Sequence, residues 1–525
     1  MKSILFLPKL FLLLLLIENA NAQTWLQGWN TLGVADYGYC IKPHISGHLY
    51  ATGSVSQCTV PIDTIVDGGF IAKYNTDGTL VWARPAGSDP VDFAFDLSGN
   101  ICVTGRYSYN SYIGDTLPPI TGGNNPDIFI AKFDTAGNLL FARTAGGVLG
   151  ENSNGITADS YNNIYITGSF VDTCYFDSDT IISRGGQNDG DIFIAKYDST
   201  GNFTWARSAG GRNDYENGQA IDTDGSGNIY FTGTFRDTAY FGSIMQISSG
   251  LSDIFVAKYD ASGTPVWVRN DGVSFNLDQG LGIYTDVAGN SYVAENYNNK
   301  AGVSKYTTAG TIVWQQIAQS GILQSGKDVT VDAAGNIYLT GHFQQELSWN
   351  GSGTILSHGS ADVFVVKFNS IGNFESFITG GGTDYDQATS IAVDDSGMVY
   401  STGSFTGFGT FGNLTLVALD SIYQSAYFLK SGMPITTYVT DVNSKNNGVV
   451  FPVPANDFVN IQCITSSVTK FLIVYSVEGI EISRYEAHNQ PSTFRIDVTE
   501  FKNGMYFYSI QEEEIINKGK FIVIH

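Results

Sequence analysis

Positively charged residues are scarce in this chain. It has 27 lysines and arginines against 50 aspartates and glutamates, a formal net charge of −23 at pH 7. Most of the imbalance falls in residues 23–433, with 18 basic and 39 acidic side chains. Nucleic acids and anionic lipid surfaces are bound through basic patches. The composition therefore excludes both as expected partners.

Cysteine and histidine are also rare, and the patterns of common active sites are missing. No C-x-x-C pair occurs, so we expect buried small hydrophobes rather than a disulfide framework or a zinc site. Neither G-x-S-x-G nor H-E-x-x-H is present. The segment "GILQSGKD" nearly spells a phosphate loop, but Asp328 stands where Ser or Thr must bind magnesium. We expect no catalytic residues and no firmly bound cofactor. The five cysteines are Cys40, Cys58, Cys102, Cys174 and Cys463.

Long apolar runs are confined to the N-terminus. Leu10 to Ile17 is apolar, Lys2 and Lys9 precede or flank it, and Ala20-Asn21-Ala22 fits a signal-peptidase site. We therefore interpret residues 1–22 as a signal peptide. No later run approaches the roughly 18 apolar residues that a membrane span needs, so we predict no membrane span.

Glycine and aromatic residues are abundant, and they recur in a repeated unit. The chain has 60 Gly, 33 Phe and 29 Tyr, which favours short strands and tight turns. The unit is an apolar strand, Asp-x-x-Gly-Asn, a strand ending in Thr-Gly, a variable loop, Asp-Ile-Phe-Ile-Ala-Lys-Tyr and Trp-Ala-Arg. Its lysine appears in seven copies, and its glycine in six, with Ala294 taken as the equivalent in the fifth copy. The lysines are Lys73, Lys132, Lys196, Lys258, Lys305, Lys367 and Lys430.

Four strands per unit and a period of about 60 residues are typical of propeller blades. The seventh copy lacks its last strand, and "TWLQGWN" near the N-terminus aligns with "FTWARSAG" of the third copy. We predict an all-β fold in which residues 23–433 form a seven-bladed β-propeller, with the N-terminal strand closing the last blade. The units resemble SBBP-type propeller repeats of bacterial surface proteins and, in the fifth copy, NHL-type blades. This resemblance implies the fold and no particular chemistry.

A different unit follows the repeats. Residues 434–447 form a polar linker, and residues 448–525 alternate in a way that predicts a small β-sandwich. Pro452 to Asn456, Tyr475 to Gly479, Asn503 to Tyr506 and Lys520 resemble the type A C-terminal sorting domain of the type IX secretion system in Bacteroidetes-type bacteria. Phe451 and Val453 depart from the usual opening of that domain. The resemblance implies the outer-membrane secretion machinery as a partner, and a secreted or outer cell-surface location after transit through the periplasm.

One segment of the repeats suggests a cation. "DTDGSGN" places Asp222, Asp224 and Asn228 close together, as in calcium loops, although it aligns with an ordinary hairpin turn carrying one inserted residue. We keep these three residues as a candidate calcium site. For the seven lysines we expect a structural role between blades, paired with hairpin aspartates such as Asp159, Asp222 and Asp394.

These features favour a non-catalytic binding or adhesion propeller with an extracellular protein or glycan as ligand. The variable loops are the expected contact surface. The spacing from the Thr-Gly glycine, or Ala294, to the lysine is 20 to 28 residues in six copies but 11 in the fifth, which predicts a groove at the fifth blade. The alternatives are a glycan-acting hydrolase or lyase on the same scaffold, and a structural component of a surface layer.

Overall fold

The computed structural model divides the chain into two compact units, Met1–Thr436 and Thr437–His525. The structure describes residues 25–30, 36–56, 67–108, 111–113, 125–187, 189–212, 216–272, 277–411, 414–418, 424–432, 450–451, 458–462, 469–475, 481–488, 493–502, 504–512 and 515–523. The predicted signal peptide, the linker 434–447 and the Pro452 to Asn456 motif lie outside these residues. Cys58 and Cys463 also lie outside them.

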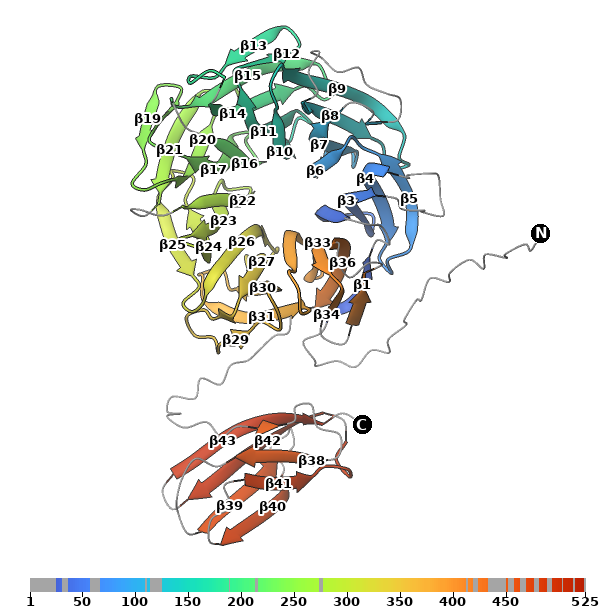
Figure 1. Ribbon diagram of the computed structural model, residues 1–525, viewed down its shortest axis with the longest axis vertical. Coiled ribbons are helices and arrows are strands. Elements are labelled where there is room, and N and C mark those ends of the chain that lie inside the picture. The colour runs from blue at the N-terminus through green and yellow to red at the C-terminus, as the bar shows by residue number, and fades with distance from the viewer. Residues whose placement is uncertain are drawn as a thin grey trace, which may run out of the picture. The chain divides into compact units, whose positions relative to one another are not determined.

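Seven antiparallel sheets surround a central axis in the first unit (Figure 1). The fold is a seven-bladed β-propeller, as the repeats predict. Blade 1 consists of β2 (Tyr37–His44), β3 (His48–Ser56), β4 (Asp67–Asn75) and β5 (Leu80–Pro85). Blade 2 consists of β6 (Asp89–Phe95), β7 (Ile101–Tyr107), β8 (Asp127–Phe133) and β9 (Leu139–Gly147). Blade 3 consists of β10 (Asn152–Ala158), β11 (Ile164–Val171), β14 (Gly190–Tyr197) and β15 (Phe203–Gly210).

The remaining blades repeat the order from the inner to the outer strand. Blade 4 consists of β16 (Asn217–Thr223), β17 (Ile229–Phe235), β20 (Asp253–Tyr259) and β21 (Pro265–Asp271). Blade 5 consists of β22 (Gln279–Thr285), β23 (Ser291–Tyr297), β24 (Lys300–Tyr306) and β25 (Ile312–Ile317). Blade 6 consists of β26 (Ile322–Val331), β27 (Ile337–Gln344), β30 (Asp362–Phe368) and β31 (Phe374–Gly381). Blade 7 consists of β32 (Gln387–Val393), β33 (Met398–Thr406), β36 (Gln424–Gly432) and β1 (Trp25–Asn30).

The seventh blade is built from both ends of the propeller sequence. β1 pairs antiparallel with β36, and Trp29 lies opposite Phe428 in the register. Closure of this kind removes the open sheet edges that a linear array of blades would expose. The N-terminal strand therefore holds the ring together through backbone pairing with the last copy of the repeat.

Variable loops of three blades form hairpins that pair with the preceding blade. β12 (Thr173–Phe176) and β13 (Asp179–Ile182), from the loop of blade 3, extend the sheet of blade 2 through β9. β18 (Thr238–Phe241) and β19 (Ile244–Ile247) extend blade 3 through β15. β34 (Phe408–Phe411) and β35 (Leu414–Val417) extend blade 6 through β31. In blade 6 itself, the loop forms the short pair β28 (Glu346–Leu347) and β29 (Ile355–Leu356).

The recurring turn and glycine have direct structural reasons. In the Asp-x-x-Gly-Asn turn of blade 2, Asp96 Oδ1 accepts the N–H groups of Ser98 and Asn100, at 2.8 and 2.9 Å. Gly99 adopts φ +79°, where a side chain is disfavoured. The Thr-Gly glycine is needed for a different reason, since a Cβ on Gly168 would lie 1.8 Å from the Asn152 carbonyl oxygen. Close approach of two strands therefore selects glycine there.

The seven recurring lysines are structural, and in blades 2 and 4 the lysine pairs with the hairpin aspartate, as predicted. In six of the seven blades the ammonium lies over the ring of a tyrosine from the second strand, for example Lys196 over Tyr165 at 5.1 Å. Lys132 pairs with the turn carboxylate of Asp96 at 2.7 Å. Asp159 and Asp394 instead accept hydrogen bonds from backbone N–H groups of their own turns. Each also accepts a tyrosine hydroxyl, that of Tyr165 for Asp159 and that of Tyr400 for Asp394. The prediction of lysine pairing at these two aspartates was wrong, because a nearer tyrosine hydroxyl occupies the carboxylate.

The second unit contains two sheets around a small apolar core. One sheet consists of β37 (Val450–Phe451), β38 (Phe458–Gln462) and β41 (Thr493–Asp497), and the other of β39 (Thr469–Tyr475), β40 (Glu481–His488), β42 (Gly504–Glu512) and β43 (Ile515–Val523). Val459 and Ile496 from the first sheet are buried with Leu472 and Tyr508 from the second. This arrangement agrees with the predicted sandwich. Among the described residues, no helix is long and apolar enough to cross a membrane.

Candidate functional site

The inner strands of all seven blades share an irregularity that turns side chains toward the axis. In each inner strand the register with the second strand skips one residue, or two in blade 2, and blade 6 has a further shift between Ile322 and Ser325. A bulge of this kind re-aims a side chain. These bulge residues line a cavity of about 610 Å³ on the axis. They are Tyr39, Val91, Asn154, Gln219, Leu281, Lys327 and Thr389.

Three aspartates line the same cavity, and each is held by the next blade. Asp92 Oδ2 accepts the N–H of Ile156 at 3.1 Å. Asp222 Oδ2 and Asp328 Oδ2 accept N–H groups of blades 5 and 7, at 2.7 and 3.0 Å. The carboxylates in blades 2, 4 and 6 therefore fasten blades 3, 5 and 7 and keep fixed orientations in the cavity.

Two lysines bring positive charge to the cavity, and only one of them is paired. Lys42 Nζ lies 3.0 Å from Asp92 Oδ1; burial opposes its charge, but Asp92, Cys40 and Asp328 together outweigh that effect and raise the pKa of Lys42. Lys327 donates no hydrogen bond and forms no ion pair within the described ranges, and burial lowers its pKa. The cavity thus contains one neutralised ion pair and one lysine with unused donors.

Burial also changes the acidity of the other groups. It raises the pKa of Asp222 to about 6 and that of Asp328 to about 6, while backbone donors and Lys42 act in the opposite direction. Burial, followed by the charge of Asp222, raises the pKa of Tyr284 to about 12. At neutral pH the cavity therefore presents carboxylate acceptors, a phenol and a lysine within one polar lining.

The candidate calcium residues belong to two parts of blade 4, the hairpin turn and the inner strand. Asp224 begins the turn, where its Oδ1 accepts the N–H groups of Ser226 and Asn228, and its Oδ2 accepts Asn228 Nδ2 at 2.7 Å. Asp222 lies in the inner strand β16 and lines the axial cavity. The turn has the same hydrogen bonds as the other blades, so it contains no inserted residue. Calcium at Asp222, Asp224 and Asn228 stays a prediction.

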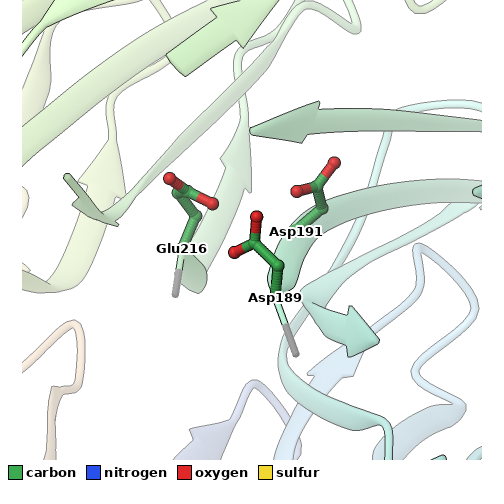
Figure 2. A group of neighbouring side chains, drawn as sticks. All are labelled: Asp189, Asp191 and Glu216. Carbon is green, nitrogen blue, oxygen red and sulfur yellow. The ribbon is translucent and has the colours of Figure 1, made fainter. Parts of the chain in front are cut away.

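Buried carboxylates gather at a different place, between blades 3 and 4. Asp189, Asp191 and Glu216 each offer an oxygen within 4.8 Å of the others (Figure 2). The N–H of Glu216 donates to the carbonyl of Gly190 at 2.7 Å, which links the two blades. Burial, together with the charge of Asp189, raises the pKa of Asp191 to about 7. Oxygen ligands of this kind suit hard cations.

The corresponding junction between blades 6 and 7 has a pair of carboxylates, Asp362 and Asp386. The N–H of Asp386, at the start of blade 7, donates to Ala361 of blade 6 at 2.9 Å, and Asp386 accepts the N–H groups of Gly382 and Thr406. Burial raises its pKa to about 7, and Asp362 contributes. The recurrence supports a role in joining blades, and Asp189 is an additional carboxylate at the junction of blades 3 and 4.

The remaining predictions about sites have mixed outcomes. Cys40, Cys102 and Cys174 are buried and free, as expected for small hydrophobes. In blade 5 a tight turn at Asn298 and Asn299, with φ of 53° and 57°, replaces the variable loop. The hairpins of blades 3, 4 and 7 occupy part of the surface that was predicted to contact a ligand. The axial cavity was not predicted from the sequence. The available signal was the charged residues Lys42, Asp92, Lys327 and Asp328, which lie in inner strands that otherwise contain mostly small or apolar residues.

Comparison with known families identifies the second unit. Residues 449–524 match the family model of the secretion-system C-terminal sorting domain. The C-terminal unit is a sorting domain. The sorting domain covers the two sheets described above and agrees with the resemblance found in the sequence.

Relatives of the whole chain are distant. An uncharacterized WD repeat-containing protein of Acanthamoeba polyphaga mimivirus is 23% identical over 505 residues, covering 74% of this chain and 36% of that protein. The regulatory protein FlaEY of Caulobacter vibrioides is 24% identical over 366 residues, covering 62% and 37%. The chain thus spans little more than a third of the length of these relatives.

Similar solved structures include a protein from Lactobacillus plantarum, with 13% identity, a TM-score of 0.35 and coverage of 65% of this chain and 87% of that one. Prolyl oligopeptidase B from Galerina marginata has 9% identity and a TM-score of 0.34, with coverage of 73% and 47%.

Proposed function

We propose that this chain is a non-catalytic binding protein that acts outside the cell after export by type IX secretion. The sorting domain supports export, and its resemblance to the type A domain supports the type IX route. The signal peptide at residues 1–22 would first deliver the chain to the periplasm. The final location is then the medium or the outer cell surface.

The axial cavity is the observation that supports binding. Its volume of about 610 Å³ falls within the range of small-molecule pockets. The carboxylates are fixed by backbone donors of the next blade, so their orientation is set before a ligand arrives. Preorganised polar groups of this kind reduce the ordering cost of binding.

A hydrolase on the same scaffold is the second candidate. It is favoured by the raised pKa values of Asp222 and Asp328, both about 6, since a general acid or base works best near the ambient pH. The backbone N–H groups that hold both carboxylates favour positioning over proton transfer.

One experiment separates the two candidates. The exported protein is incubated with glycans and proteins from cell-surface extracts, and captured and unbound material is analysed by mass spectrometry. Binding predicts captured components of unchanged mass and no new products. Time-dependent cleavage products, lost in Asp328→Asn, would establish an enzyme and reject the proposal.

A further inference from the structure

The chemistry of the axial cavity indicates which class of ligand it takes, and this inference rests on the proposed binding function. Its charged lining consists of Lys42, Lys327, Asp92, Asp222 and Asp328. A small anion would meet three carboxylates there. A bare cation would meet two ammonium groups and carboxylates that already accept backbone N–H groups. Neither a small anion nor a bare cation therefore fits a lining that contains both positive and negative side chains.

Unused hydrogen-bonding groups lie on neighbouring positions of blade 6. Lys327 has three donors and makes no hydrogen bond within the described ranges. The next residue, Asp328, accepts the N–H of Val329 on Oδ1 at 2.8 Å and the N–H of Ile391 on Oδ2 at 3.0 Å. The Ser390 side chain gives a third hydrogen bond, and because a carboxylate has about four lone-pair sites, Asp328 retains room for one more donor. A donor and an acceptor are therefore adjacent.

Blades 4 and 5 add further polar groups to the cavity. The amide of Gln219 is a bulge side chain without a hydrogen bond to any described residue, and it supplies both a donor and an acceptor. Tyr284 adds a half-buried ring and a phenol. Tyr39 adds a second ring, whose hydroxyl is already committed to Asp89 at 2.8 Å.

We propose that the axial cavity binds a neutral saccharide. Each sugar hydroxyl both donates and accepts a hydrogen bond, which matches the adjacent Lys327 and Asp328. The aromatic rings offer apolar surface to the C–H face of a sugar ring. Gln219, Lys327 and Asp328 are the specificity-determining side chains, and the Lys42–Asp92 pair maintains the shape of the cavity.

The test uses the full-length exported protein and isothermal titration calorimetry. The probes are neutral monosaccharides and disaccharides (glucose, galactose, mannose, N-acetylglucosamine, maltose and cellobiose), with glucuronate, glucosamine, spermidine and calcium chloride as charged comparisons. We expect at least one neutral sugar to bind, and the charged probes to bind at least tenfold more weakly.

Three variants locate the site. Lys327→Met removes no hydrogen bond or ion pair to a described residue, so it should fold normally and weaken sugar binding at least tenfold. Gln219→Ala should also weaken sugar binding. Asp328→Asn should also weaken binding, and its melting temperature reports any loss of the contact with blade 7. Asp395→Asn, in an exposed turn, is the matched control and should bind like the parent.

Several results would overturn the inference. Sugar affinity unchanged in Lys327→Met and Gln219→Ala would place the sugar elsewhere. Tight binding of glucuronate that is lost in Lys327→Met, or of spermidine that is lost in Asp328→Asn, would keep the cavity as a binding site and reject the saccharide class. A panel without any neutral binder would also reject that class, while capture of another ligand from surface extracts would leave the proposed binding function standing.

Discussion

The glycine of the Thr-Gly pair occupies a position where one extra carbon atom cannot fit. A Cβ on Gly168 would lie 1.8 Å from a backbone carbonyl oxygen, and backbone cannot move aside as a flexible side chain can. Overpacking of this kind costs about 1–3 kcal/mol. We expect Gly168→Ala to lower the free energy of unfolding by that amount or more in urea titrations. Gly353→Ala, where a Cβ meets nothing within 4 Å, should leave it unchanged, and equal effects would contradict this account.

A buried glutamate replaces the corresponding glycine in blade 5. Glu295 is fully buried and accepts Gln315 Nε2 at 3.1 Å. Burial, followed by the charge of Asp271, raises its pKa to about 8. The folded state thus binds a proton that the unfolded state releases above about pH 4.5, so this group makes stability fall as the pH rises from there to about 8.

The variant Glu295→Gln imitates the protonated form without titrating. We expect it to flatten this pH dependence and to be more stable than the parent at pH 8 by roughly 4 kcal/mol. Urea unfolding at pH 5 and pH 8 measures the difference. Glu346→Gln, on an exposed side chain, is the control; parallel pH profiles for the parent and Glu295→Gln would show that Glu295 is ionised in the fold.

Residue-level predictions from the repeat failed where the repeat itself is broken. The glycine position of blade 5 was assigned to Ala294, but the register pairs Glu295 with Gly280, as other blades pair glycine with glycine. Asp222 was taken for a turn aspartate because Asp224 follows two residues later. A single sequence cannot decide such shifts, since inner-strand bulges change the register by one residue.

At the scale of elements, β1 carries the closure of the ring. Deleting Trp25–Asn30 leaves β36 as an open edge, and we expect the melting temperature of the propeller to fall by roughly 5 °C or more. Adding the same six-residue segment as a synthetic peptide should restore part of the loss, whereas a scrambled peptide should not. An unchanged melting temperature in the deletion variant would contradict closure by this strand.

The hairpin between β16 and β17 is where calcium was predicted. If the ion binds Asp222, Asp224 and Asn228, then 1 mM calcium should raise the melting temperature relative to a chelator, because a ligand of the folded state stabilises it. The shift should disappear in Asp224→Asn only if the turn itself binds the ion. Equal melting temperatures with calcium and chelator would remove this prediction.

Strand order within a blade could be predicted because period-two alternation and the Asp-x-x-Gly-Asn turns act locally. The pairing of β12, β18 and β34 with the preceding blade could not, since it depends on which loop reaches which outer strand. The axial cavity was missed for the same reason. Lys327 and Asp328 lie in one inner strand, but their partners come from blades that are adjacent only in space.

At the scale of the whole molecule, the chain combines an acidic, closed propeller with an export signal. The sorting domain at residues 449–524 explains the second unit, and the axial cavity gives the first unit a place for a ligand. The negative charge of residues 23–433 disfavours nucleic acids and anionic membranes as partners. Together these features are the basis of the proposed binding function outside the cell.

Export is the claim on which the rest of the account depends. The most direct measurement compares, in a host with type IX secretion, the location of the full chain, a chain truncated after residue 448, and a reporter fused to residues 434–525. The account predicts the full chain and the fusion in the medium or at the cell surface, and the truncated chain in the periplasm. Export of the truncated chain, or periplasmic retention of the fusion, would contradict it.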